Sequence, residues 1–369
     1  MNVDAIDPNK DYTLISPAQY ISRENILEDC GKFISRWGKK ALVSGGNRAM
    51  KSIEDKLFPA LDKSGIGWEK LMFSGECCDE NISKIAEKAK RVKADVIIGV
   101  GGGKSLDSAK AAAESCGVPI VCIPTIAATC AASSALSVIY TSGGVHQRDY
   151  YLEKNPNLVL VDPAIIANAP IEYLESGILD SLSKWYEGRA AFKGIKDPDV
   201  STSSAIRLSL LLNEIMEKEA ESAVKAVKNR QVTSAVITII DLNIYLAAVI
   251  QGFGKRTRGA AAHCIHSGLS VLEESHSIPH GFKVGYGIIV QLFMEETPVN
   301  EIGRVVNFFR LMDLEPSFKG MKLPFSPQIL KAVAEKSLLG DTMKYMPFEV
   351  TADKVVAAME KAEKAVPEW

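Results

Sequence analysis

In the first half of the chain, short apolar runs alternate with segments whose apolar residues recur at helical spacing. The apolar runs predict buried strands, and Asn81–Val92 and Ser105–Glu114 predict helices. This strand–turn–helix–strand order is typical of a doubly wound, mainly parallel sheet. The expected strands are Ala41–Val43, Lys70–Ser74, Asp95–Val100 and Pro119–Ile123, then Ala135–Tyr140 and Leu158–Val161, which the loop Thr141–Gln147 joins.

The pattern changes after Asp162-Pro163, where almost every segment has an apolar period of about 3.6 residues. Comparable strand runs are missing there, so a helical domain is expected. We therefore predict an α/β domain over residues 1–162 and an all-α domain over 163–369. The expected helices are Glu172–Ala191, Ser201–Ala226, Arg230–Gln251, Ala260–Leu272, Phe282–Phe293, Ile302–Leu311, Gln328–Lys336 and Ala352–Ala365.

Composition narrows the class of protein. A chain of 369 residues with 47% hydrophobic and 24% charged residues can form two globular domains. A net charge of −2 gives no electrostatic reason to expect nucleic acid or an anionic membrane as a partner. The most apolar stretch, Val232–Phe253, is interrupted by polar residues, which favours a buried core helix over a membrane span. These residues are Thr238, Asp241, Asn243 and Gln251.

Cysteine usage and the start of the chain indicate a compartment. Seven cysteines is an odd number, and the adjacent Cys77 and Cys78 lack the CxxC spacing of a zinc or redox pair. No basic segment leads into an apolar one at the start, so no signal peptide is expected. Buried free thiols in a reducing cytoplasm are the expectation.

A glycine turn, Gly101-Gly102-Gly103, follows the predicted strand Asp95–Val100. Without Cβ atoms the backbone can approach a ligand closely, and the N–H groups that open the next helix favour phosphate oxygens. Lys104 could add a positive charge or lie in solvent. The pattern differs from GxGxxG on a first strand, and Ile98 stands where a Walker A loop needs glycine. A tight turn without a ligand is the alternative.

Four of the five histidines lie close together in the sequence, at His263, His266, His276 and His280. His263 and His266 share a helix face, but periodicity alone leaves open which of the four bind metal. Asp180 lies on an otherwise apolar helical face, where a carboxylate needs a partner. Asp180, His263 and His280 together would suit a divalent metal with an open coordination position.

Several long motifs in the same order resemble the glycerol dehydrogenase-like branch of the iron-containing alcohol dehydrogenase superfamily. The resemblance covers nearly the whole chain. It implies an N-terminal dinucleotide-binding domain, a C-terminal helical domain and an active site with its metal in the cleft between them. The motifs are Gly101–Lys110, Pro124–Thr129, Ser134–Tyr140, the Asp180 segment, Ala261–Leu269 and His280–Gly287.

The resemblance also implies site residues and chemistry. It makes Asp180, His263 and His280 the ligands of a metal that acts as a Lewis acid, while hydride passes between NAD(P) and the substrate carbon. His266 is a candidate proton relay or a group supporting a ligand, against simple packing. With Gly101 and Gly102 of the turn, the expected coenzyme contacts are Gly103, Lys104, Ser105, Leu106, Asp107, Thr125, Ile126, Ala127, Ala128, Ser134, Leu136 and Tyr140.

Two departures from the family concern the substrate. Glycerol-oxidising relatives have an aspartate at the position of Cys130, and Lys184 lies one helical turn from Asp180. Lysine here would ordinarily be solvated or paired, for example with Glu187. With Cys130 it makes the pocket more positive, so we expect a 2-oxo acid and 2-hydroxy acid pair, with Lys184 near the carboxylate. The chain is also similar to family members that reduce 2-oxo acids.

A third departure concerns the coenzyme. NAD-preferring relatives place an aspartate after the first strand, where this chain has Gly46-Asn47-Arg48. Without that carboxylate a 2′-phosphate is not repelled, and Arg48 could pair with it, so NADPH is expected alongside NADH.

Three alternatives stay open at this point. They are an NAD-dependent dehydrogenase of glycerol or another vicinal diol, a lyase or synthase of the dehydroquinate synthase-like fold, and a non-catalytic nucleotide-binding protein. The second would need a cluster of basic residues near the histidines, which the sequence lacks. Zn²⁺ and Fe²⁺ suit the ligands equally. Relatives assemble through the N-terminal domain, so a homo-oligomer is expected, but the number of subunits is not indicated.

Overall fold

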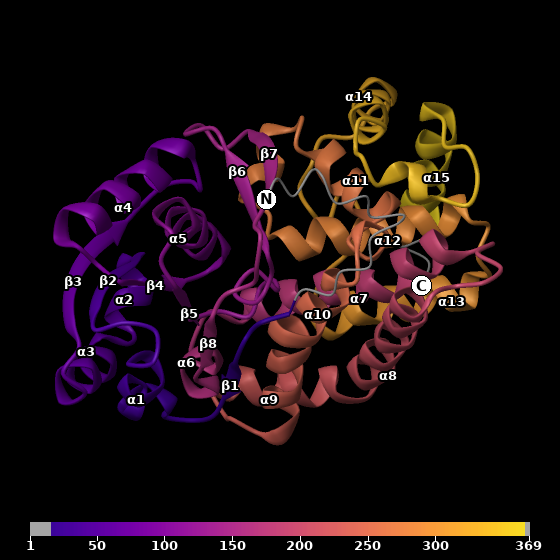
Figure 1. Ribbon diagram of the computed structural model, residues 1–369. Helices are drawn as coiled ribbons and strands as arrows, with labels where there is room; N and C mark the ends of the chain where they lie inside the picture. Colours follow the sequence, from indigo (N-terminus) through magenta and orange to yellow (C-terminus); the bar gives the residue numbers. More distant parts are fainter. Residues whose placement is uncertain (1–15, 366–369) are drawn as a thin grey trace. The chain divides into compact units, whose positions relative to one another are not determined.

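The computed structural model describes residues 16–365, which form two compact units (Figure 1). Unit 1 runs to Ile171 and also includes Ala226–Gly252, and unit 2 comprises Glu172–Lys225 and the chain from Phe253 on. This division differs from the expected boundary near Asp162, because the helical segment 226–252 belongs to the unit that holds the sheet. Periodicity shows that a segment is helical, but not which element covers its apolar face.

Unit 1 is built on a six-stranded sheet in the order β1-β8-β5-β4-β2-β3. All its strand pairs are parallel, as the alternating pattern predicted. The central strands are apolar along their whole length, since both faces of such a sheet are covered. The strands are β1 (Tyr20–Ser22), β2 (Lys40–Gly46), β3 (Gly67–Phe73), β4 (Val96–Gly101), β5 (Ile120–Pro124) and β8 (Leu158–Val161).

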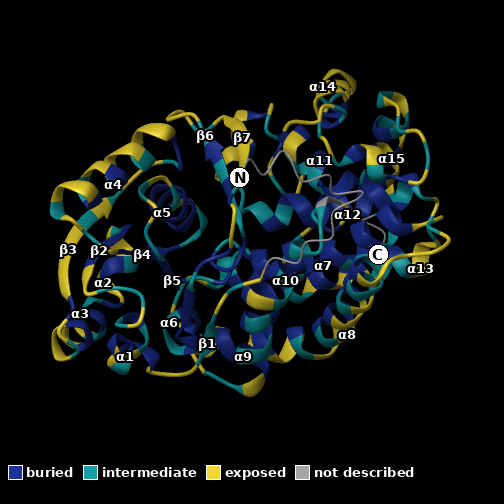
Figure 2. Cartoon of the chain, viewed as in Figure 1, coloured by how far each residue is buried: buried dark blue, intermediate teal, exposed yellow. Residues whose placement is uncertain are grey.

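Helices pack on both faces of this sheet. Val43, Ile98 and Ile123 belong to one buried cluster with Leu57 of α3. On the other face a Cβ on Gly99 would meet Ala109 of α5 at 2.8 Å, so the two backbones approach closely here. Figure 2 shows how thoroughly α5 is buried. The helices of this part are α1 (Gly31–Ile34), α2 (Asn47–Lys51), α3 (Glu54–Lys63), α4 (Asp79–Val92), α5 (Gly103–Cys116) and α6 (Pro163–Ala167).

Two strands were missed, and one connection was predicted wrongly. Strand β6 (Leu136–Tyr140) is outside the parallel sheet and forms an antiparallel hairpin with β7 (His146–Tyr151). The loop predicted at Thr141–Gln147 therefore leads into β7 and not to β8. The β7 sequence, HQRDYY, is polar and largely exposed, so it has no apolar pattern to detect. Strand β1 has only three residues, too few for a periodic signal.

Unit 2 is helical throughout the described residues, as predicted for this part of the chain. The expected helices are present, with bounds that differ by a few residues. They are α7 (Ile171–Phe192), α8 (Val200–Lys228), α11 (Ala261–Leu269), α12 (His280–Met294), α13 (Val299–Leu311), α14 (Pro327–Ser337) and α15 (Ala352–Ala365). Helices α7 and α8 each extend slightly beyond the unit at one end.

The remaining helical segment, Ser234–Gly252, lies in unit 1 and is interrupted. It consists of α9 (Ser234–Asp241), a π-helical turn η3 (Leu242–Leu246) and α10 (Ala247–Gly252). By length and composition it is the one helix of the described chain that could cross a membrane. In the structure 56% of its most apolar window is buried, and Asp241 accepts a hydrogen bond from Tyr20 Oη at 2.7 Å. Both observations fit the predicted core helix.

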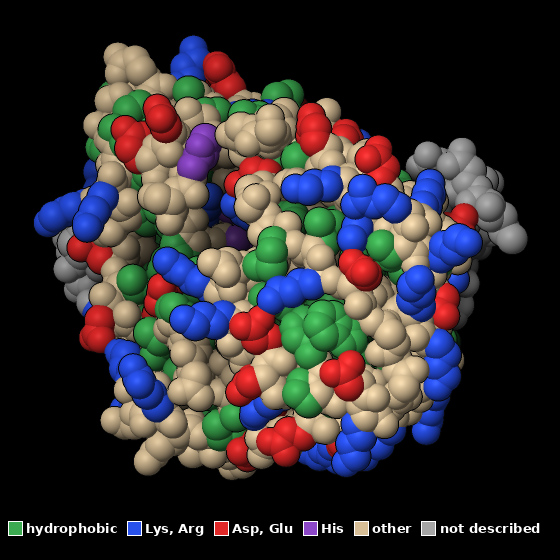
Figure 3. Space-filling view, turned by 90° about the vertical axis from the view of Figure 1, so that its left-hand side faces the viewer, with side chains coloured by type: hydrophobic (Ala, Val, Ile, Leu, Met, Phe, Trp, Pro, Cys, Tyr) green, Lys and Arg blue, Asp and Glu red, His purple; other side chains and the backbone are tan. Residues whose placement is uncertain are grey.

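Charged side chains are mixed on the face drawn in Figure 3. Lysines and arginines lie between aspartates and glutamates, and the described side chains there form no broad area of one sign. This distribution agrees with the small net charge and offers no extended basic surface on that face.

Candidate active site

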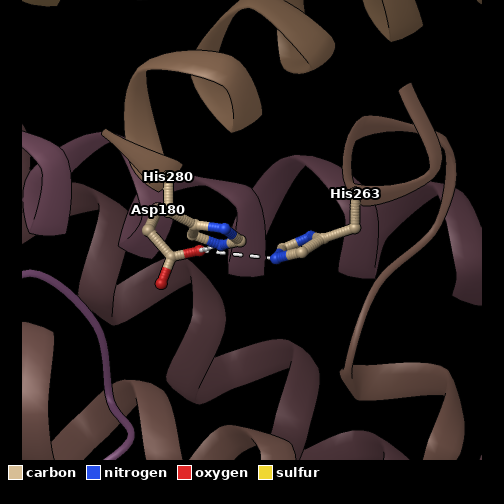
Figure 4. A group of neighbouring side chains, drawn as sticks. All are labelled: Asp180, His263 and His280. Atoms are coloured by element: carbon tan, nitrogen blue, oxygen red, sulfur yellow. Dashed lines mark ion pairs between the residues drawn. The ribbon is translucent and has the colours of Figure 1, made fainter. Parts of the chain in front are cut away.

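Three helices of unit 2 bring a carboxylate and two imidazoles together. Asp180 lies in α7, His263 in α11, and His280 is the first residue of α12. Asp180 Oδ1 is 3.4 Å from His263 Nε2 and 3.3 Å from His280 Nε2. One ligand atom from each of the three lies within 4.8 Å of the others, and Figure 4 shows the side chains pointing toward one another. Residues from distant parts of the sequence thus form the predicted group.

The chemistry of this group fits a divalent cation. Asp180 is 4% exposed, and its Oδ1 faces the two imidazole nitrogens at 3.3 and 3.4 Å without a well-formed hydrogen bond. A buried carboxylate oxygen so placed is costly unless a positive charge compensates it. Burial raises the pKa of Asp180, but the Lys184 ammonium and the two imidazoles outweigh it and hold the pKa well below its usual value. The carboxyl group is therefore in the ionised form that binds metal.

Glu187 fixes the ring of His263 from the other side. Its Oε2 is 2.6 Å from His263 Nδ1, and its Oε1 accepts the backbone N–H groups of Ala260 at 2.6 Å and His263 at 2.9 Å. Burial lowers the pKa of His263, but the Glu187 carboxylate outweighs that effect and raises it to about 9. With Nδ1 engaged, Nε2 is the nitrogen that faces Asp180, which is the usual arrangement behind a metal-binding histidine.

The supporting role of Glu187 was missed from sequence, where Glu187 was only a suggested partner of Lys184. One signal was present, because Asp180 and Glu187 are seven residues apart and so lie on the same face of a helix. Nothing in the sequence, however, indicated which histidine would meet that face. The Lys184–Glu187 ion pair, which was the ordinary alternative for Lys184, does not form directly, and both Glu187 oxygens accept from α11 and the residue before it.

His266 stands behind the second imidazole. Its Nε2 is 3.2 Å from His280 Nδ1, so His280 also presents Nε2 to Asp180. Burial, followed by the nearby His280 and Lys283, holds the pKa of His266 well below its usual value, so the ring is neutral. Of the roles considered for His266, which were proton relay, support of a metal ligand and simple packing, this position fits support of the ligand His280 best. His276 lies apart from the group, with its Nε2 3.1 Å from the Ser270 carbonyl oxygen.

Lys184 is a buried cation with few partners. Its side chain is 2% exposed, its Nζ donates to Ser183 Oγ at 3.3 Å, and no described carboxylate pairs with it directly. It lies one turn after Asp180 on α7. Burial raises the pKa values of the Asp180 and Glu187 carboxylates, and Lys184 lies near enough to help lower them, but neither contacts the ammonium directly. A buried ammonium without a direct ion-pair partner favours a negatively charged ligand.

The glycine turn of unit 1 lies at the point where the strand order reverses. The chain goes outward from β2 to β3 and then returns to β4 on the other side of β2. The carboxyl ends of β2 and β4 are therefore neighbours, and Gly45 pairs with Val100. Such a switch point is where doubly wound sheets bind their ligands. The turns at Gly46 and Gly101 meet there, since a Cβ on Gly101 would lie 3.4 Å from Ala49 Cβ.

The turn itself requires glycine. Gly101 has φ = +130°, a backbone conformation that other residues rarely adopt. A Cβ on Gly102 would lie 2.6 Å from Ile126 Cδ1, so the segment after β5 packs tightly against the turn. A small pocket lies between them, and several expected coenzyme contacts line it. Its lining residues are Gly102, Gly103, Leu106, Pro124, Ile126, Ala128, Thr129, Ala131 and Ala132.

Other expected coenzyme contacts take part in hydrogen bonds within the unit. The Ser105 side chain donates from Oγ to the Val100 carbonyl at 2.8 Å, and the backbone N–H of Thr125 donates to the Gly101 carbonyl at 3.1 Å. Asp107 pairs with the buried Lys110 at 2.9 Å. The role of Lys110 was not expected from the sequence. Its Nζ also donates to the backbone carbonyls of Ala131 at 2.7 Å and Ser134 at 3.1 Å, in the loop before β6, and of Leu136, the first residue of β6.

The remaining predicted residues of unit 1 lie at the edges of this region. Lys104 is exposed and forms an ion pair with Glu76 at 2.5 Å. Arg48 is exposed in α2. Tyr140 is the last residue of β6, and its ring meets His146 edge to face at 5.9 Å. Cys130 is buried, and its Sγ donates to Gln251 Oε1 at 3.4 Å.

A doubly wound sheet with a phosphate-type turn, and a helical unit with an Asp–His–His group, are the arrangement expected of an enzyme that uses a nucleotide and a metal. Residues 17–163 match the family model of the iron-containing alcohol dehydrogenases. The chain is 34% identical to a glycerol dehydrogenase of Pseudomonas putida, over 95% of this chain and 96% of that protein. It is 32% identical to hydroxycarboxylate dehydrogenase A of Escherichia coli strain K12, over 95% and 97%.

A solved structure agrees with these matches. The crystal structure of glycerol dehydrogenase from Schizosaccharomyces pombe superimposes with a TM-score of 0.90 at 28% identity, covering 98% of this chain and 92% of that one. The chain therefore belongs to the iron-containing alcohol dehydrogenase family. It is an oxidoreductase that interconverts small alcohols and their carbonyl compounds, which favours the dehydrogenase prediction over the lyase and non-catalytic alternatives.

Proposed function

We propose that this enzyme interconverts a small 2-oxo acid and the corresponding 2-hydroxy acid. The observation that carries the proposal is Lys184, a buried ammonium one helical turn from Asp180 that forms no direct ion pair with a described carboxylate. A substrate carboxylate would supply a direct partner and gain a charge-assisted hydrogen bond. Cys130, which stands where glycerol-oxidising relatives carry an aspartate, supports the same substrate class. So does the similarity to a relative named hydroxycarboxylate dehydrogenase.

The residues of unit 2 have separate tasks in this proposal. Asp180, His263 and His280 would hold a divalent metal, Zn²⁺ or Fe²⁺, which supplies Lewis-acid polarisation of the substrate oxygen when it is bound. Glu187 and His266 hold the two imidazoles with Nε2 toward Asp180. Lys184 orients the substrate by its carboxylate, so that only the 2-oxo group is presented for reduction.

The residues of unit 1 would bind the coenzyme. The turn at Gly101–Gly103 and the N-terminus of α5 suit its pyrophosphate. Arg48, exposed beside the end of β2, suits a 2′-phosphate, so we propose that NADPH is used as well as NADH. We also propose that the enzyme is cytoplasmic and forms a homo-oligomer. The family resemblance supports both.

A single set of assays tests the substrate. We expect a higher kcat/KM for 2-oxobutanoate reduction than for glycerol oxidation, measured with NADH or NADPH, or their oxidised forms, and with added Zn²⁺, Mn²⁺ or Fe²⁺. A clear preference for glycerol would refute the 2-oxo acid proposal and support the second candidate, a glycerol or vicinal-diol dehydrogenase. That candidate is favoured by relatives named glycerol dehydrogenase at 33–34% identity. Absence of turnover with NADPH, where NADH is turned over, would refute the proposed use of NADPH.

A further inference from the structure

The apolar segment Ser234–Gly252 carries buried polar side chains that the proposed chemistry does not use. Asn243 is fully buried, and its Nδ2 donates to the backbone carbonyl of Ala127 at 3.1 Å. Asparagine is a poor helix former and is costly to bury, so it needs a reason to be there. Its hydrogen bond reaches the segment between β5 and β6.

That segment, residues 125–135, has no regular secondary structure, so its backbone groups depend on partners from elsewhere. Lys110 holds its later carbonyls, at Ala131 and Ser134. Asn243 holds it at Ala127. The residues on either side of Ala127, Ile126 and Ala128, line the pocket beside the glycine turn. Asn243 therefore supports the wall of the pocket without lining it.

The π-helical turn places a second side chain on the same loop. Gln251 Oε1 accepts from Cys130 Sγ at 3.4 Å, three residues beyond Ala127. In an unbroken α-helix, residues eight positions apart, such as Asn243 and Gln251, would differ by about 80° around the axis. The extra residue of a π turn reduces this difference to about 20°. The π turn at Leu242–Leu246 thus brings both amides to nearly the same side of the helix, where each contacts the loop.

We propose that Asn243 is a positioning residue for the coenzyme, and that the π turn exists to direct it and Gln251 at the loop after β5. The inference rests on the proposed function, because it assigns the pocket beside the glycine turn to the coenzyme. Loss of the amide would leave the buried Ala127 carbonyl without this donor and release Ile126 from its contact with Gly102.

Equilibrium titration of the purified enzyme with NADH and NADPH, followed by nucleotide fluorescence, tests this role. Asn243→Leu keeps the branched shape but removes the donor, and Asn243→Ala is the second variant should the larger leucine prevent folding. We expect the coenzyme Kd to rise about tenfold. Zn²⁺ affinity, which depends on unit 2, should stay within twofold, and kcat at saturating coenzyme should change less than KM for the coenzyme.

Asn213→Ala is the matched control, because it removes another buried helical asparagine, in unit 2, whose Nδ2 donates to Glu217. It should leave the coenzyme Kd unchanged. A folded Asn243 variant with wild-type coenzyme affinity overturns the inference and leaves the proposed function intact, as does an equal loss in the control. Wild-type protein that binds neither NADH nor NADPH overturns the proposed function and the inference together.

Discussion

The Glu187 carboxylate fixes both the start of α11 and the orientation of the His263 ring. It is 2% exposed and accepts three N–H groups, two from the backbone at the start of α11 and one from the ring of His263. The same contacts fix the helix start and the imidazole orientation. Glu187 lies outside the metal-binding group, but its contact with Nδ1 of His263 leaves Nε2 of that ring facing Asp180.

Replacing Glu187 with glutamine should weaken metal binding. Glu187→Gln keeps the shape but removes the negative charge, so His263 loses the partner that orients it and increases its basicity. We expect the Kd for Zn²⁺ to rise about 10- to 100-fold, measured by competition with a chromophoric chelator. Glu217→Gln, which changes an exposed glutamate of α8, is the control. Unchanged zinc affinity in folded Glu187→Gln would show that Glu187 serves only the start of α11.

Replacing Lys184 should separate charged substrates from neutral ones. Lys184→Met keeps the length of the side chain in its buried site but removes the ammonium. A lost hydrogen bond between charged groups is worth about 1.5–3 kcal/mol, or roughly 10- to 150-fold in kcat/KM for a 2-oxo acid. A neutral aldehyde of similar size should lose much less, and the exposed Lys331→Met should affect neither. Equal losses for both substrates would contradict a carboxylate-binding role.

Helices and strands with a long, regular apolar pattern could be located from the sequence, and those without such a pattern could not. Helices such as α7 and α12, and strands such as β4, carry long apolar patterns, and their positions agree with the prediction. Strand β7 is polar and forms only because β6 pairs with it, so its signal is not local. The π turn in Ser234–Gly252 is also invisible to a pattern of one fixed period.

The candidate site was predictable in part, for a similar reason. Asp180, His263 and His280 could be chosen from residue type and resemblance, and the structure brings them together. The groups behind them, Glu187 and His266, depend on which helix faces which, and that is decided by packing across the whole unit. Lys110, which holds the loop after β5, was hidden for the same reason.

At the scale of the element, the packing of the glycine turn against the loop after β5 can be tested with a substitution at Gly102 and a compensating one at Ile126. A Cβ on Gly102 would lie 2.6 Å from Ile126 Cδ1, whereas the backbone angles at Gly102, with φ = −97°, suit any residue. Gly102→Ala should therefore act through this clash and raise the coenzyme Kd about tenfold, as measured by fluorescence titration. Ile126→Val removes Cδ1, so the double variant should recover most of the loss. A double variant as weak as Gly102→Ala would indicate that the methyl group blocks the coenzyme directly.

At the scale of the whole molecule, each proposed ligand is tied to a different compact unit. The metal group lies wholly within unit 2, and the glycine turn, the loop after β5 and the segment 226–252 lie wholly within unit 1. A ligand stabilises the folded state that binds it, by about 2.7 kcal/mol at a concentration one hundred times its Kd. Metal and coenzyme should therefore protect different parts of the chain from local opening.

Chelation followed by hydrogen–deuterium exchange tests this division directly. Removing metal with EDTA should increase exchange in the first turns of α11 and α12, because the bond that ties Asp180, His263 and His280 together through the metal is then lost. Exchange in α5 should respond instead to NADH or NADPH. Restoring Zn²⁺ should reverse the first effect, and activity should return with it. Exchange in α11 and α12 that is the same with and without EDTA, in protein shown to contain metal beforehand, would place the metal elsewhere and remove the basis of the proposed chemistry.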